Sequence, residues 1–367
     1  MNALAPSLAV LSLTWREAST ETRNLAAAPL AAHDVDELAR HGAHGVVQVH
    51  TCARSMWVLS AHDASWAGAL LQAHVSRSLR AAGSEVLPAL LVQDDALDHL
   101  FRVSLGLDSL VEGEAEIGGQ VVGAFQLAGR AGLLDATLQA TWRVLAELRA
   151  DARREAIVRP GRGMGQLAVE TLLREGILPS QRVGVVGLGS IGTQVRASLA
   201  RAGFTAADVY TRTPRLGAAS LDAIARADVV AWVVCTSAPA AWFVAPRPSL
   251  VIDLGRPAQA LVPGIGLDAL FRRPGLCLPP AQRVRAEELV KLAQLQWHSR
   301  ARLRSSHAVL GRIRSLRDAY VHEQLPALLD DALADVPAAT RKKVLAAAQA
   351  AASQYGRAVL DTVKRER

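Results

Sequence analysis

A cysteine between two cationic residues is the first candidate for chemistry in this chain. Cys52 follows an apolar segment in VVQVHTCAR, where a strand runs out into polar residues. The period of two in an extended strand would place His50, Cys52 and Arg54 on one face. Two potential cations beside a thiol lower its pKa and favour the thiolate, which is the nucleophilic form. Cys52 is therefore our candidate catalytic nucleophile, with an ordinary buried or exposed thiol as the alternative.

The other two cysteines are expected to be packing residues. Cys235 ends an apolar run and Cys277 lies between two leucines, as a small apolar side chain would. Three cysteines cannot form a disulfide framework and indicate a reducing compartment, so we expect a cytoplasmic protein. The longest apolar run, 229–235, is far shorter than the roughly 20 residues that span a bilayer, so no membrane association is expected. The apolar N-terminus lacks a preceding Lys or Arg and alternates like a strand, which argues against a signal peptide.

A glycine-rich turn in the middle of the chain has the pattern of a dinucleotide site. The segment VGVVGLGSIGTQV places Gly187, Gly189 and Gly192 in a GxGxxG pattern between an apolar strand and a helix. The first glycine permits a tight turn, the second lets a pyrophosphate approach, and the third lets helix and strand pack closely. The alternative is a glycine-rich structural turn. The expected cofactor-binding residues of this turn are Gly187, Leu188, Gly189, Ser190, Ile191 and Gly192.

The end of the next strand indicates which dinucleotide would bind. A site for NAD carries Asp or Glu there to hold the ribose 2′-hydroxyl, whereas this chain has Thr211, Arg212 and Thr213. A guanidinium and two hydroxyls suit a 2′-phosphate, so we predict NADPH rather than NADH. Asp208 is the nearest acid, but it falls at the start of that strand. A solvated surface charge is the alternative interpretation of Arg212.

A second group of polar residues occurs among glycines in the segment 99–125, which reads HLFRVSLGLDSLVEGEAEIGGQVVGAF. Its polar members include Asp108, Ser109, Glu112, Glu114, Glu116 and Gln120. A solvated helix face with acids near its start would have a similar composition. The five glycines, however, would each cost about 1 kcal/mol inside a helix. They indicate that the backbone approaches something closely here.

The order of elements predicts a multidomain protein with α+β, α/β and helical parts along its 367 residues. The expected elements of the first part are strands at 8–15, 45–50 and 56–61 and helices at 66–81, 97–105 and 110–149. The expected elements of the second part are strands at 182–187, 207–210, 229–236 and 250–255 and helices at 190–202 and 221–226. Alternation of strands with helices is typical of a parallel sheet. We predict three domains, 1–155, 156–280 and 281–367, with a linker at 159–165, long helices after 280 and no metal site.

Arginine dominates the charge of the chain. Forty-one basic residues against 34 acidic ones give a net charge of +7, and only four of the basic residues are lysines. The segment 283–317 carries nine basic residues and two acidic ones. Arginine reads phosphates with two parallel hydrogen bonds, which favours a nucleic-acid or nucleotide partner. A compositional bias of the genome is the alternative explanation.

Four segments, in this order, together resemble glutamyl-tRNA reductase, the enzyme that opens tetrapyrrole biosynthesis from glutamate. They are HTCARSMWVL, HLFRVSLGLDSLVEGEAEIGGQV, the GLGSIG turn followed by TRT, and VIDLGRP. The resemblance covers about residues 8–316 and is most specific in the second segment. It implies an N-terminal α+β catalytic domain, a Rossmann-type NADP-binding domain and a C-terminal helical dimerisation domain. It also implies tRNA(Glu) charged with glutamate as substrate, a homodimer, and product handover to glutamate-1-semialdehyde aminotransferase.

The resemblance assigns roles to residues of the first part. Cys52 would be the nucleophile, and His99 would correspond to an important histidine of the family. The expected substrate-binding positions are Thr51, Cys52, Ala53, Arg54, Ser109, Glu114, Ala115, Glu116 and Gln120. Two of the motifs depart from the family. His50 and Ala53 stand for the Ser and Asn of S-T-C-N-R, and Ala115 and Glu116 stand for the last two residues of G-E-P-Q.

The implied mechanism is attack of the Cys52 thiolate on the ester of glutamyl-tRNA, followed by reduction of the resulting thioester by NADPH to glutamate-1-semialdehyde. Arg54 would hold the substrate carboxylate, and His99 would move a proton or orient a neighbour. A hinge at 159–165, or a nicotinamide reaching across a cleft, must join thiol and cofactor. Two other classes remain open: a Rossmann oxidoreductase acting on a small molecule, and a non-catalytic relative that binds tRNA.

Overall fold

The structure is a computed structural model that describes residues 7–28, 30, 32–212, 217–236, 250–255 and 264–365. It divides into two compact units, Met1–Trp297 and His298–Arg367. The first unit holds both sheets and every described side chain of the candidate site.

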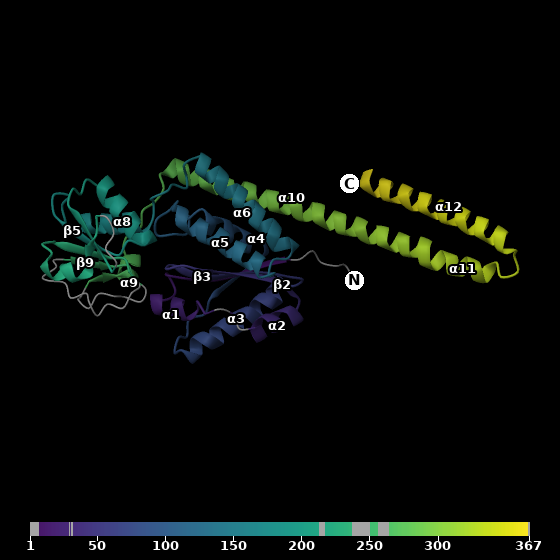
Figure 1. The fold of residues 1–367 in the computed structure, drawn as a ribbon, viewed down its shortest axis with the longest axis horizontal. Coiled ribbons are helices and arrows are strands. Elements are labelled where there is room, and N and C mark those ends of the chain that lie inside the picture. Colours follow the sequence, from purple (N-terminus) through teal and green to yellow (C-terminus); the bar gives the residue numbers. More distant parts are fainter. Residues whose placement is uncertain are drawn as a thin grey trace. The chain divides into compact units, whose positions relative to one another are not determined.

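The first unit begins with a four-stranded antiparallel sheet in the order β2-β3-β1-β4. The strands are β1 (Ser7–Thr14), β2 (Ala43–His50), β3 (Arg54–Ala61) and β4 (Ala89–Val92). All residues of β1 and β3 are buried, because they form the centre of the sheet and helices cover both of its faces (Figure 1). The three strands expected here are confirmed, whereas the short β4 was not expected.

Two groups of helices cover this sheet (Figure 1). On one face lie α2 (Ala32–Arg40) and α3 (Ala64–Ala81), and on the other lie α4 (Gln93–Ser104), α5 (Ala115–Arg130) and α6 (Ala136–Arg154). A short helix, α1 (Thr20–Leu25), follows β1. The side chains of Trp57, Leu71 and Val75 form part of the core between the sheet and α3.

The single helix expected at 110–149 is wrong. The structure has two helices, α5 and α6, because polar and glycine signals interrupt the chain between them. Gly132 has a φ of +73°, in the left-handed region that favours glycine. Asp135 then caps α6, with its carboxylate accepting from the Leu138 amide at 2.9 Å. The apolar spacing continues from α5 into α6, so the spacing alone does not indicate the break between them.

The second sheet has six parallel strands in the order β10-β9-β8-β5-β6-β7. The strands are β5 (Val183–Val186), β6 (Ala207–Thr211), β7 (Ala219–Ser220), β8 (Ala231–Val234), β9 (Leu250–Asp253) and β10 (Ile265–Gly266). If the six strands are numbered 1 to 6 from β5 to β10, their order in the sheet is 6-5-4-1-2-3. This is the doubly wound arrangement of dinucleotide-binding sheets. The α/β prediction is therefore confirmed, with the first strand and its glycine turn at the centre.

Helices α7 (Met164–Arg174), α8 (Ser190–Arg201) and α9 (Leu267–Phe271) accompany this sheet. The glycine-rich turn lies between β5 and α8, as expected. The helix expected at 221–226 is present as a short 3-10 helix, Leu221–Arg226.

The helical part expected after residue 280 is confirmed. Helix α10 (Pro280–Ala319) begins in the first unit and continues into the second. The π-helical segment η2 (Tyr320–Gln324), α11 (Leu325–Ala332) and α12 (Ala338–Arg365) follow. Within the second unit, the Gln349 amide on α12 donates to the Val321 carbonyl at 3.2 Å. Among the described residues, no helix combines the length and the apolar character needed to cross a membrane.

Candidate active site

Cys52 lies at the tip of the hairpin that joins β2 to β3. The Thr51 amide donates to the Arg54 carbonyl at 2.9 Å and closes the turn. The Thr51 hydroxyl accepts hydrogen bonds from the amides of Ala53 and Arg54, both at 3.1 Å. The expectation that His50, Cys52 and Arg54 share one face of a single strand is wrong, because the chain reverses direction between His50 and Arg54.

A buried arginine that sequence reasoning missed holds the hairpin tip. Arg23 of α1 donates from Nε and Nη2 to the Cys52 carbonyl, at 3.1 and 2.9 Å. Its guanidinium lies 3.6 Å from Asp268 and over the ring of Phe271, 5.1 Å from the centroid. Asp268 also accepts hydrogen bonds from the amide and hydroxyl of Thr20, at 2.9 and 2.6 Å. Residues more than 200 positions apart therefore fix the backbone that carries the thiol.

A small pocket surrounds Cys52. Its lining consists of Thr51, Cys52, Ala53, Arg54, Ser109, Leu110, Val111, Glu114, Glu116, Ile117, Gln120, Met164 and Phe271. All the predicted substrate-binding residues except Ala115 are in this set. The cavity measures about 30 Å³, which is small beside the roughly 300–1,000 Å³ of typical ligand pockets.

Arg54 is the cationic side chain among the residues that line this pocket. It is fully buried, and its Nη2 donates to the Asp108 carbonyl at 2.7 Å. Its Nε and Nη1 are also buried and have no hydrogen-bond partner among the described residues. Burial lowers the pKa of Arg54, while the charges of Asp108 and Glu114 oppose that change. A buried guanidinium with two such donors is suited to receive a carboxylate.

His99 is not among the residues that line the pocket. Its Nε2 is 3.1 Å from the Ser12 hydroxyl, and its Nδ1 is 3.5 Å from the Asp108 carboxylate. Burial alone would raise the pKa of Asp108, but the hydrogen bond and charge of His99, with the charges of Arg102 and Arg54, lower it to about 2. The contacts favour His99 as a residue that orients Asp108, whose carbonyl holds Arg54.

Glu114 is the buried carboxyl group of the pocket. Its pKa is raised to about 7, mainly by burial and also by the charge of Glu116. The hydrogen bond from Ser109 and the charge of Arg54 act in the opposite direction. At neutral pH this side chain is therefore divided between its acid and carboxylate forms. It can donate a hydrogen bond in one form and accept in the other.

The loop between α4 and α5 is joined to both segments that leave the first part. Val111 pairs with Leu276, and Glu114 pairs with Arg159, in isolated parallel bridges. The Glu112 carboxylate accepts from the Leu278 amide at 2.9 Å and forms an ion pair with Arg283, also at 2.9 Å. The loop that carries Ser109 and Glu114 is thus held by the linker and by the start of α10.

The expected close approach at the glycines of this region is confirmed at Gly118 and not at Gly123. A Cβ atom on Gly118 would lie 2.2 Å from the Ser104 carbonyl oxygen and 2.4 Å from Arg149 Nε, whereas one on Gly123 would meet nothing within 4 Å among the described residues. The neighbour at Gly118 is protein, so this glycine serves helix packing.

The glycine turn after β5 fits a dinucleotide. Gly187 has a φ of +95°, and a Cβ atom on Gly192 would lie 1.9 Å from the Gly187 carbonyl oxygen. Both positions therefore need glycine for the turn and for close packing of α8. A Cβ atom on Gly189 would meet no described atom within 4 Å, and in the GxGxxG pattern this is the glycine that lets a pyrophosphate approach the backbone. Ser190 and Ile191 begin α8 directly beside it.

The residues after β6 are described only in part. Thr211 ends β6 and Arg212 follows as an exposed side chain, while Thr213 lies outside the described residues. Asp208 forms an ion pair with Arg182 at 2.7 Å. Asp208 therefore lies near the start of β6, as expected, and is paired with Arg182. Arg212 follows the carboxyl end of the same strand.

Part of the basic segment 283–317 is neutralised by acids. Arg283 pairs with Glu112, and Arg285 pairs with Glu155 at 2.6 Å. Contact of this segment with nucleic acid, including Arg300 and Arg302 farther along α10, stays a prediction.

The other cysteines differ from one another. Burial and the neighbouring Asp253 raise the pKa of the Cys235 thiol to about 12, in keeping with its packing role. Cys277 is exposed, so the expectation of a packing residue is wrong there. Its neighbour Leu278 is buried instead, because the extended segment turns alternate side chains in opposite directions.

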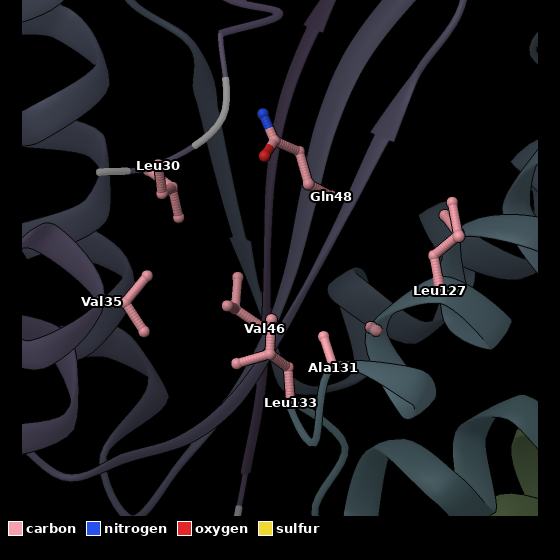
Figure 2. A pocket seen from close by; sticks show the side chains of 9 residues that line it. Leu30, Val35, Val46, Gln48, Leu127, Ala131 and Leu133 are labelled. Atoms are coloured by element: carbon pink, nitrogen blue, oxygen red, sulfur yellow. The ribbon is translucent and has the colours of Figure 1, made fainter. Parts of the chain in front are cut away.

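A second pocket lies at the edge of the first sheet (Figure 2). Val46 and Gln48 of β2 face Leu127 of α5 and Ala131, which follows α5, across it. Its cavity measures about 260 Å³, and the described residues that line it include no ionisable or nucleophilic side chain. The pocket at Cys52, which contains the thiol, is the candidate for chemistry.

The fold and the site together define a class of protein in which a thiol pocket is combined with a sheet of the dinucleotide-binding type. A family model described as "Glutamyl-tRNAGlu reductase, N-terminal domain" matches residues 11–155. Glutamyl-tRNA reductase 1 of Pyrobaculum calidifontis is 31% identical over 274 residues, which cover 69% of each protein. The chain belongs to the glutamyl-tRNA reductase family.

Two further similarities involve Methanopyrus kandleri. Its glutamyl-tRNA reductase is 38% identical over 161 residues, and this match spans 40% of the present chain and 39% of that protein. A solved structure of glutamyl-tRNA reductase from the same organism covers 98% of both chains at 23% identity, with a TM-score of 0.47.

Proposed function

We propose that this chain reduces glutamyl-tRNA(Glu) to glutamate-1-semialdehyde through a thioester on Cys52, the first step of tetrapyrrole biosynthesis by the C5 route. The observation that carries the proposal is Arg54: a fully buried guanidinium, lining the same pocket as a thiol, with two donors that no described residue engages. A glutamyl ester has a carboxylate for the guanidinium and an acyl carbon for the sulfur. Family membership supports this choice of substrate.

The first step joins the acyl group to sulfur. The Cys52 thiolate attacks the ester carbonyl, a C–S bond forms, and the C–O bond to the terminal ribose of the tRNA breaks. The departing ribose oxygen takes up a proton, which the acid form of Glu114 can supply because its pKa is raised to about 7. Arg54 holds the side-chain carboxylate, and Asp108, oriented by His99, holds Arg54.

The second step reduces the thioester and returns the thiolate. Bound at the turn from Gly187 to Gly192, NADPH would supply the hydride that replaces sulfur on the acyl carbon and yields the aldehyde. Ser190, at the start of α8, would meet the pyrophosphate, and Arg212 would meet the 2′-phosphate. A soft nucleophile suits this sequence of steps, because a thioester accepts hydride more readily than an ester does.

The remaining expectations follow from the same proposal. A homodimer, handover of the aldehyde to glutamate-1-semialdehyde aminotransferase and a cytoplasmic location are proposed from family membership. Arg300 and Arg302 are proposed to contact tRNA phosphates, which would make binding weaken steeply with salt.

One incubation tests the proposal. Protein mixed with glutamyl-tRNA labelled in the glutamate, without NADPH, should become labelled on Cys52, and adding NADPH should release the label as aldehyde. The Cys277→Ser protein is the matched control, because it loses an exposed thiol, retains Cys52 and should label equally. A non-catalytic tRNA-binding relative would bind the tRNA and form no thioester. A small-molecule oxidoreductase would act equally well on free glutamate derivatives.

A further inference from the structure

A carboxylate from the catalytic part reaches the start of the dinucleotide helix. Glu116 Oε1, on the first turn of α5, accepts hydrogen bonds from Gln194 Nε2 and from the Ser190 hydroxyl, the latter at 3.3 Å. Ser190 is the first residue of α8 and follows Gly189 directly. The Glu116 carboxylate therefore contacts the first turn of α8, next to the glycine turn.

The surroundings of this contact hold Glu116 in place. A Cβ atom on Gly163 would lie 3.3 Å from the side-chain oxygen of Gln194 and 3.5 Å from Glu116 Oε2, so linker, α5 and α8 meet here. The N-terminus of a helix carries partial positive charge and favours an anion. A carboxylate and a pyrophosphate have the same reason to lie there, and two like charges at one helix end repel each other.

We infer that Glu116 competes with the pyrophosphate of the dinucleotide for the start of α8 and thereby sets the affinity for the cofactor. The inference rests on the proposed function only in taking the ligand to be a nicotinamide dinucleotide. Without the dinucleotide, Glu116 bonds Ser190 and Gln194 and connects the catalytic part to α8. When the dinucleotide binds, its pyrophosphate takes the contact with Ser190 and Glu116 withdraws. Position 116 is also one where this chain departs from the family motif, which has an uncharged Gln.

The test is dinucleotide binding to the full chain, measured by calorimetry without tRNA. Glu116→Gln keeps the size and the hydrogen-bonding atoms but removes the charge, so the Kd for NADPH should fall about tenfold. Glu85→Gln removes the same charge from an exposed loop of the first part and should leave the Kd unchanged. NADPH and NADH share the pyrophosphate, so Glu116→Gln should lower the Kd for both by the same factor. Adenosine 2′-monophosphate lacks the pyrophosphate, so its Kd should not change.

A second variant separates the contact from a general effect of charge. Gln194→Met removes the amide that holds Glu116 and should also tighten NADPH binding, while adding little in a protein that already carries Glu116→Gln. Such non-additivity is expected only if the two residues act through one contact. Equal Kd values for the parent, Glu116→Gln and Glu85→Gln proteins would overturn the inference. Failure of every variant to bind either dinucleotide would overturn the proposed function together with it.

Discussion

Glu114 offers a substitution whose effect on stability depends on pH. Burial raises the pKa of this carboxyl group from the ordinary 4.5 to about 7, against the hydrogen bond from Ser109 and the charge of Arg54. Glu114→Gln keeps the shape and can still accept from Ser109, but it cannot ionise. The comparison of the two proteins therefore isolates the cost of the buried charge.

The sign of the pH dependence depends on whether the folded or the unfolded state binds the Glu114 proton more tightly. The folded parent protein has the higher pKa, so it loses stability as the pH rises from about 4.5 through about 7. One pKa unit corresponds to about 1.4 kcal/mol, and the difference between the two values corresponds to roughly 3 kcal/mol. We expect the free energy of unfolding of the variant, relative to that of the parent, to rise by roughly 3 kcal/mol as the pH increases from about 4.5 to about 8. Above that pH the difference should stay constant.

Urea unfolding followed by tryptophan fluorescence at several pH values measures this difference directly. Glu85→Gln, at an exposed position, should differ from the parent by a small amount that does not vary with pH. A free-energy difference between Glu114→Gln and the parent that stays constant across this pH range, or that grows as the pH falls, would refute the reasoning.

Three further substitutions test the proposed chemistry. Cys52→Ser should abolish both thioester formation and reduction while Cys277→Ser keeps both; an active Cys52→Ser enzyme would exclude the mechanism. Arg54→Lys should lower kcat/KM for glutamyl-tRNA at least tenfold, because an ammonium cannot grip a carboxylate with two parallel bonds; equal turnover would remove Arg54 from the substrate site. Arg212→Glu should raise the KM for NADPH far more than that for NADH, and a parent enzyme that prefers NADH would contradict that role.

Much of the fold could be predicted because its signals are local. Short apolar runs mark the strands of both sheets, and the glycine spacing marks the turn before α8. The break between α5 and α6 was missed because the apolar spacing continues across it. Gly132 is nevertheless typical of a helix end, and Asp135 is typical of a helix start.

The candidate site was predicted only where its residues lie in recognisable motifs. The hairpin motif and the loop before α5 placed Cys52, Arg54 and Glu114 among the candidates. Arg23 could not be found, because one arginine in a short polar helix has no pattern of its own. Its importance comes from burial beside Asp268, a contact between distant parts of the chain.

The hold of Arg23, Asp268 and Phe271 on the hairpin also has a consequence during synthesis of the protein. Residue 271 is added 219 positions after residue 52, and at about 5–20 residues per second this takes roughly 10–40 s. During that interval the nascent chain presents the Cys52 thiol without the wall that Phe271 later supplies. The thiol is therefore more open to oxidants in the nascent chain than in the folded protein, where Phe271 lines its pocket.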